Sequence, residues 1–208
     1  MIRDRFIFGL AMLWVIAAAV ILTILLAIPL FAVEMSIFHL SAIAGISDAS
    51  LWHNYLVLMN YLLNPFVGHL AFPDFVSSSN GLKHFAEVKG LFMLTWALVL
   101  VLLPAFVIFV KENLRISFHN ALRAFMIVPL AFGIIAGLIG FDNFFVYFHE
   151  ILFRDSTWLF DPALDPIINV LPEQFFMHCF ILFGLIYELI FYCLYKKGYS
   201  RIRKQKSK

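Results

Sequence analysis

Long apolar runs dominate the chain, and four of them are long enough to cross a membrane. A spanning helix needs about 20 consecutive, mainly apolar residues. Runs with no charged residue, or with Glu188 alone, cover residues 6–33, 90–110, 124–141 and 175–195. We therefore predict four transmembrane helices in these four ranges.

The first apolar run follows Arg3 and Arg5 and could be mistaken for a signal peptide. Its 28 residues from Phe6 to Val33 are too many for the apolar region of such a peptide, and no A-x-A cleavage pattern follows. We expect it to remain as the first span.

The two long segments between the runs, residues 34–89 and 142–174, also contain helical patterns. DASLWHNYLVLMNYLLNPF is amphipathic, with an N-cap expected at Asp48 or Ser50 and an end before Pro65. LKHFAEVKGLF is expected to start a helix that runs directly into the second span. FFVYFHEILF is expected to continue the helix of the third span.

Composition agrees with a lipid-embedded chain. Apolar residues make up 63% of the sequence, and the mean hydropathy is +0.93, so polar groups are too few to cover a water-soluble globule. The expected fold is an all-α membrane protein of one integral membrane domain, residues 1–208. Cys179 and Cys193 would lie roughly 21 Å apart along one helix, too far for a disulfide.

The distribution of Lys and Arg predicts the orientation. Twelve of the 15 lie in the N-terminus, the 111–123 connection and the C-terminal tail, which the positive-inside rule places in the cytoplasm. Segments 34–89 and 142–174 hold only three basic residues and ten acidic ones. We therefore expect both termini inside and both segments outside, forming an extracellular cap of helices and loops.

His84 and His149 come from different outer segments and are expected at similar depths. His84 precedes Gly90 by six residues, about 9 Å along a helix, and His149 follows Phe141 by eight, about 12 Å if the helix continues. Ten of the 36 residues from Phe141 to Phe176 are aromatic. They are expected to form either the aromatic wall of a site at the level of the lipid headgroups or an ordinary aromatic belt at the membrane surface.

Several carboxylates have two interpretations. Those of the second outer segment are either caps and turn residues near its prolines or groups that orient a histidine or a cationic substrate: Asp155, Asp161, Asp165 and Glu173. Glu188 lies within the fourth span, where a carboxylate is costly. We expect it to be protonated, hydrogen-bonded and structural, and the alternative is a catalytic or transport role.

Familiar catalytic signatures are absent from the sequence. It has no G-x-S-x-G and no Gly-rich phosphate loop, and Phe153 stands where H-E-x-x-H would need its second histidine. Two histidines without a nucleophilic partner suit proton transfer. The residues alone leave open a non-enzymatic membrane protein that binds lipid or a partner, a transporter, and a metal-dependent lipid hydrolase.

Three stretches carry a resemblance to a known family: NYLVLMNYLLNPF, FVSSSNGLKHFAEVKGLF and FDNFFVYFHEILFRDSTWLFDPALDPIINVLPEQFF. Together with the four-span layout they resemble the lipoprotein intramolecular transacylase family, Lit, of Gram-positive bacteria. The resemblance implies four spans in the bacterial cell membrane under an extracellular cap. It also implies an acyltransferase that moves the sn-2 acyl chain of a diacylglyceryl-modified lipoprotein onto the amine of its own N-terminal cysteine, giving the lyso form.

The resemblance assigns the chemistry to the histidines at the matching positions, His84 and His149. For contacts with the substrate we select residues of the same segments: Tyr61, Phe145, Phe148, Trp158 and Asp161. The expected partners are the diacylglyceryl-modified lipoprotein and membrane lipids, with no nucleic acid. No metal and no cofactor is expected, because aminolysis of an ester needs only proton transfer and positioning.

Overall fold

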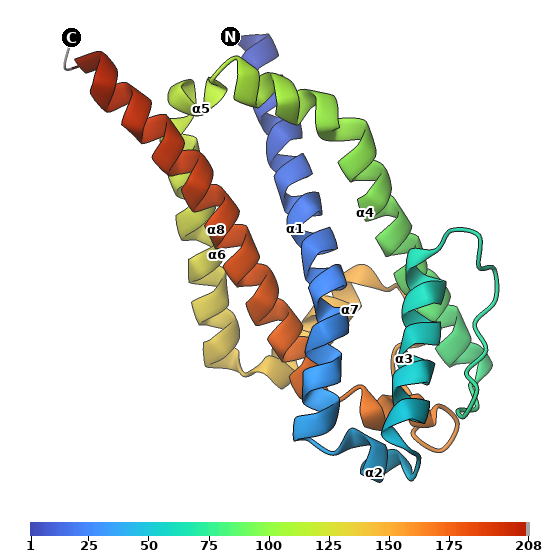
Figure 1. The fold of residues 1–208 in the computed structure, drawn as a ribbon. Helices are drawn as coiled ribbons and strands as arrows, with labels where there is room; N and C mark the ends of the chain where they lie inside the picture. The colour runs from blue at the N-terminus through green and yellow to red at the C-terminus, as the bar shows by residue number, and fades with distance from the viewer. Residues whose placement is uncertain (207–208) are drawn as a thin grey trace. The chain divides into compact units, whose positions relative to one another are not determined.

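Helices account for the regular structure of the chain (Figure 1). The computed structural model describes residues 1–206, with the side chains of residues 1–198, and this part contains no strand. Its elements are α1 (Ile2–Ile37), α2 (Leu40–Ala44), α3 (Asp48–Leu63), α4 (Ser79–Lys111), α5 (Leu114–Ser117), α6 (His119–Ile139), α7 (Phe141–Leu152), the 3₁₀ helix η1 (Pro166–Val170) and α8 (Glu173–Lys206).

Four of the helices, α1, α4, α6 and α8, are long and apolar enough to cross a membrane. Helices α1, α4 and α8 each contain a whole predicted span, and α6 covers the predicted span 124–141 as far as Ile139. The prediction of an all-α membrane protein with four transmembrane helices is therefore confirmed.

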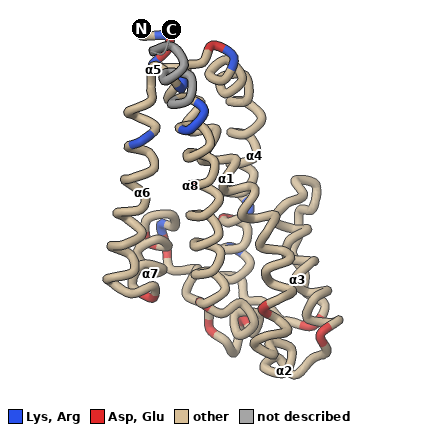
Figure 2. The backbone as a smooth tube through the Cα atoms, turned by 60° about the vertical axis from the view of Figure 1, so that its left-hand side comes forward, with Lys and Arg blue, Asp and Glu red and all other residues tan. Residues whose placement is uncertain are grey.

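The chain forms two compact units, and α1, α4 and α8 each contribute to both. Unit 1 comprises residues 1–23, 95–140 and 180–208, and unit 2 comprises residues 24–94 and 141–179. Their charges are opposite, because unit 1 carries 12 of the 15 Lys and Arg residues whereas unit 2 carries ten of the 13 Asp and Glu residues. Acidic positions of unit 2 lie around α2 and α3 (Figure 2).

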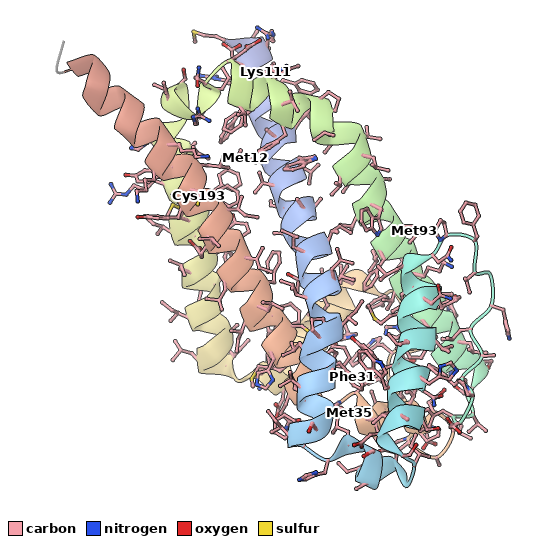
Figure 3. All side chains as sticks on the ribbon, viewed as in Figure 1. Met12, Phe31, Met35, Met93, Lys111 and Cys193 are labelled. Atoms are coloured by element: carbon pink, nitrogen blue, oxygen red, sulfur yellow. The ribbon has the colours of Figure 1, made fainter. Side chains whose placement is uncertain are left out.

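Unit 1 is a helix bundle with an apolar core. Met12 of α1 (Figure 3) is buried in that core beside Phe109 of α4 and Phe191 of α8. Phe191 stacks on Phe125 of α6 with ring centroids 5.4 Å apart. The Tyr187 hydroxyl donates to the Phe125 carbonyl over 2.9 Å, so its polar group is satisfied inside the bundle.

Unit 2 packs short elements around the end of α1. Phe31 of α1, which Figure 3 shows on the side facing α3, stacks on Tyr55 at 3.8 Å. Phe175 of α8 meets Phe31 edge to face at 5.5 Å. Contacts between α2 and η1 join the first outer segment to the second. These contacts give unit 2 a core of its own.

Two local predictions fail at turns. FFVYFHEILF does not continue the third span, because α6 ends at Ile139 and Gly140 has a φ of 85°. That conformation favours glycine and lets the chain start a separate helix, α7. The N-cap of α3 is neither Asp48 nor Ser50 but Ser47, whose hydroxyl accepts the N–H of Ser50 over 3.1 Å. The predicted helix from LKHFAEVKGLF into the second span is confirmed as α4.

Glu188 also differs from expectation. Its Oε1 is buried and has no hydrogen-bond partner among the described residues. The prediction of a hydrogen-bonded carboxyl at this position is therefore wrong. Both cysteines are free thiols, as their spacing predicts.

Candidate active site

The two predicted histidines lie side by side in unit 2. His84 is in the second turn of α4, and His149 is near the end of α7. Their ring centroids are 5.9 Å apart with an interplanar angle of 37°. The prediction that the two histidines lie at similar depths assumed that the helix of the third span continues to His149. It does not continue, because α7 is a separate helix, but the fold still brings the two rings together.

His84 is enclosed by rings. Its side chain is only 6% exposed, and the rings of Phe153 and Phe160 meet it edge to face at 4.6 and 5.5 Å. Its Nδ1 is buried without a hydrogen-bond partner among the described residues. Aromatic packing therefore holds this imidazole, and no hydrogen bond from a described residue to Nδ1 fixes its tautomer.

His149 is held by a hydrogen bond as well as by rings. Its Nδ1 lies 2.7 Å from the carbonyl oxygen of Phe145, one helical turn earlier. A carbonyl only accepts, so Nδ1 carries the proton and Nε2 bears the lone pair of the neutral ring. Burial lowers the pKa of His149 below its ordinary value, and the bond to Phe145 opposes that shift. In this tautomer Nε2 is the ring nitrogen that can accept a proton.

Residues 153–165, here called the strap, connect α7 to η1 and cover the histidines. Trp158 of the strap lies against His149 with ring centroids 4.9 Å apart. Phe160 lies against both His84 and Phe85, at 5.5 and 5.4 Å. Trp158 therefore covers His149, and Phe160, two residues later, covers His84.

Ion pairs and hydrogen bonds fix the first part of the strap to α4. Lys83 pairs with Asp155 and also lies 3.8 Å from Glu87. The buried Thr157 hydroxyl lies 2.6 Å from Asp155 Oδ1 and 3.3 Å from Glu87 Oε2. The bonds from Lys83 and Thr157 hold the pKa of Asp155 down at about 2. The two α4 residues in these contacts, Lys83 and Glu87, lie on either side of His84 in the sequence.

A second attachment lies at the end of the strap. Asp165 is 2% exposed, and its carboxylate accepts both the N–H and the hydroxyl of Ser78, over 2.8 and 2.6 Å. Of the two interpretations of this carboxylate, the structure favours a helix cap, because Ser78 immediately precedes α4.

The predicted substrate contacts divide into two groups. Phe145 and Phe148 of α7 lie against His149, with ring centroids at 4.1 and 5.6 Å, and Trp158 joins them. Tyr61 is instead buried on α3 with the Lys89 ammonium over its ring at 4.5 Å. Asp161 is exposed, and its carboxylate accepts the N–H of Ala163 in a turn.

A separate pair, between a buried carboxylate and a half-exposed histidine, lies at the end of α1. Glu34 is 3% exposed and its Oε1 lies 2.9 Å from Nδ1 of His178 on α8. This contact joins α8 to the end of α1. Among the described residues, no three His, Cys, Asp or Glu side chains gather closely enough to hold a metal ion.

Several residues around the histidines were missed by sequence reasoning. Phe153 follows His149 by four residues, so the helical i,i+4 spacing could have identified it as a ring neighbour. Thr157 and Ser78 carry no such local signal. Each also bonds a near neighbour, but the partners that tie them to another segment, Glu87 and Asp165, lie 70 and 87 residues away in the sequence.

Chemically, the arrangement supports proton transfer in a site of low polarity. One imidazole offers a lone pair, the second lies about 6 Å away, and aromatic rings surround both. Such apolar surroundings strengthen electrostatic interactions with a reacting group. Among the described residues, no serine or cysteine is paired with either ring through a hydrogen bond.

Comparison with known proteins identifies relatives over nearly the whole chain. The family model described as lipoprotein intramolecular transacylase Lit matches residues 5–176. A search of curated proteins gives no match. A solved structure of membrane-integral Lit from Bacillus cereus is 26% identical, with a TM-score of 0.77 and 99% of each chain covered.

Structures of two variants of the Bacillus cereus protein match equally well. One, with a histidine replaced by arginine, has 26% identity and a TM-score of 0.76 over 98% of this chain and 95% of its own. The other, with alanine at the same position, has 25% identity and a TM-score of 0.76 over 99% and 96%.

Proposed function

The chain belongs to the lipoprotein intramolecular transacylase family Lit, and from that membership we propose how it works: His84 and His149 carry out the proton transfers of an O-to-N acyl shift. The chain is a multi-pass membrane protein with acyltransferase activity on lipoproteins. The proposed substrate is the diacylglyceryl-modified N-terminal cysteine, whose sn-2 acyl chain moves to the α-amine.

The reaction balances within one substrate molecule. The amine nitrogen attacks the ester carbonyl carbon, so a C–N bond forms and the carbonyl oxygen becomes an oxyanion. The C–O bond to glycerol then breaks, and the glyceryl oxygen takes up a proton. The proton lost by the amine replaces the one gained by the glyceryl oxygen, so no co-reactant is consumed.

We assign His149 as the base. The hydrogen bond from its Nδ1 to Phe145 orients the ring and leaves Nε2 to accept the amine proton. The same bond remains after protonation, and hydrogen bonding to the charged form favours it. Imidazolium Nε2–H can then protonate the glyceryl oxygen. This single hydrogen bond is the observation that supports the assignment most strongly.

His84 would act as the donor that stabilises the oxyanion. An unpaired buried N–H is rare in proteins, so we expect the unpartnered Nδ1 to carry the lone pair and Nε2 to carry the proton. A donor aimed at developing charge in a dry site is worth about 2.7–4 kcal/mol of transition-state stabilisation in well-studied acyl transfers. The two rings are close enough to serve the two ends of one tetrahedral intermediate.

The proposed orientation places segments 34–89 and 142–174 outside the cell and both termini in the cytoplasm. The Lys and Arg distribution supports it. In a chain with Cys179 and Cys193 replaced by alanine, Val76→Cys should react with an impermeant thiol reagent from outside. Lys111→Cys should react only after permeabilisation. Labelling of both from one side would refute this orientation.

Mass spectrometry of the product tests the reaction. A synthetic diacylglyceryl lipopeptide should keep both acyl chains, with one moved from oxygen to nitrogen. When labelled and unlabelled lipopeptides are mixed, no labelled chain should appear on an unlabelled peptide. A third chain would indicate a separate lipid donor, and loss of a chain without N-acylation would indicate a lipase.

A further inference from the structure

Helix α4, which carries His84, begins with half of a common capping arrangement. The hydroxyl of Ser78 accepts the N–H of Gly81 over 2.9 Å, three residues later. In a complete capping box, Glu or Gln at that third position reaches back to the N–H of the first residue. Here the third position is Gly81, which has no side chain to do so.

A carboxylate from the strap takes the place of the missing side chain. Asp165 accepts the N–H of Ser78, which is the bond that Glu would make in a capping box, and also accepts the Ser78 hydroxyl. The absence of a side chain at Gly81 makes room for it. A Cβ built on Gly81 would collide with the Asp165 carboxylate, and Phe160 Cε1 lies 3.0 Å from the same point.

Completion of the α4 cap is therefore linked to the position of the strap. Asp165 and Phe160 approach the same glycine, and Phe160 continues from there to the ring of His84. His84 lies only six residues after Ser78, so the start of its helix and its covering ring are fixed together. Loss of the Asp165 bonds would release both at once.

We propose that Asp165 is a positioning residue for the acyl shift. By bonding Ser78 and occupying the space at Gly81, it fixes the start of α4 and the Phe160 ring in their positions relative to His84. This proposal rests on the catalytic role of His84 proposed above. Asp165 itself touches no reacting atom in this account.

Three substitutions test the linkage in the full-length protein in detergent. Asp165→Ala removes both bonds, and Gly81→Ala keeps every hydrogen-bonding group but fills the space. Each should lower kcat about 10- to 100-fold and change KM less than about twofold, because small misplacements of reacting groups cost that much while lipid contacts remain. Asp165→Asn should restore most of the activity, since an amide can accept the N–H and donate to the hydroxyl.

A matched control separates positioning from general loosening. Asp74 also ties an outer loop to a helix, accepting from Ser50 and Asn54 of α3 over 2.7 and 2.6 Å. Among the described residues, the hydrogen bonds of Asp74 involve only Ser50 and Asn54, and neither His84, His149 nor the strap. Asp74→Ala should therefore keep kcat within about twofold of the unchanged protein.

Chemical modification gives a second readout. Diethyl pyrocarbonate labelling of each histidine, measured by peptide mass spectrometry, should rise at least about threefold at His84 in Asp165→Ala and Gly81→Ala. Labelling of His178, paired with Glu34, should not change. Two results would overturn the positioning role. One is an equal increase in labelling at His84 and His178, and the other is a loss of kcat in Asp74→Ala as large as that in Asp165→Ala.

The outcome is distinguishable from failure of the proposed function. If His84→Ala keeps near-normal turnover, the catalytic proposal fails whatever Asp165 does. If His84→Ala is inactive but Asp165→Ala and Gly81→Ala are folded and fully active, only the positioning role is wrong. If Asp165→Ala does not fold, Gly81→Ala and Asp165→Asn still decide the question.

Discussion

Units 1 and 2 bury very different side chains. Among the residues whose side chains the structure describes, the buried polar ones of unit 1 are Thr23 and Arg115. Those of unit 2 are Glu34, Ser41, Asn54, His84, Thr157 and Asp165. Burying a polar group is unfavourable unless it is paired, so such groups are concentrated where they specify a local arrangement or perform chemistry. Unit 1 thus resembles an ordinary apolar bundle, and unit 2 is where the polar organisation of the protein lies.

This comparison predicts where substitutions should abolish activity. His149→Ala removes the proposed base and should lower kcat about 10²- to 10⁴-fold, the usual contribution of general acid–base catalysis. Glu188→Gln, in unit 1, should leave turnover within about twofold. Lipopeptide conversion by the two purified variants measures both. A large loss from Glu188→Gln would show that unit 1 takes part in the reaction.

A smaller effect is expected from the ring that covers the base. Trp158 lies 4.9 Å from His149, and Trp158→Ala should lower kcat about tenfold by loosening the imidazole and admitting water. Trp14, which packs within unit 1 and donates to the Val99 carbonyl, provides the matched control. Trp14→Phe should keep kcat near normal. Equal losses from both substitutions would remove the distinction between the units.

The pH dependence of kcat should reflect the burial of His149. The base must be neutral, so turnover falls as pH decreases through its pKa. Because burial lowers that pKa, the acid limb should lie below 6.5, the ordinary value of histidine. In Trp158→Ala the limb should move up toward 6.5, since the ring becomes better solvated. A limb in the unchanged protein above 6.5 would contradict a neutral, buried base.

The smallest effect is expected from the exposed end of the strap. The pKa of Asp155 is lowered to about 2, chiefly by Lys83, so its contribution to stability is complete above about pH 4 and is lost as pH falls through 2. Asp155→Asn should slightly lower the melting temperature at pH 7, and the difference should shrink in acid. A difference that persists at pH 2 would show that charge is not the cause.

The parts of the fold that depend on composition were predictable from sequence. About twenty consecutive apolar residues form a spanning helix regardless of where the other helices lie, because the backbone groups of a segment in lipid must bond within that segment. Residues that act through partners distant in sequence were not predictable in this way. The cap of α4, for example, joins Ser78 to Asp165 across 87 residues. The end of α6 was missed for a local reason, the backbone conformation of Gly140.

The candidate site was predicted in part for the same reason. His84 and His149 stand in segments with a recognisable pattern, and Phe145, Phe148 and Trp158 are close to His149 because they share its helix or the strap that follows it. Tyr61 and Asp161 belong to the same segments but have other partners, Lys89 and Ala163. The sequence segment in which a residue lies therefore indicates only its approximate location. The packing of α4 against the strap decides which rings contact the histidines.

The central claim is that the two adjacent histidines of unit 2 act as one proton-transfer unit. A double-mutant cycle on kcat tests it most directly, using His84→Ala, His149→Ala and the double variant on one diacylglyceryl lipopeptide. Residues that act as a unit are strongly non-additive, so the double variant should be little worse than the poorer single variant. Losses that multiply in the double variant, or near-normal turnover in both folded single variants, would contradict the claim.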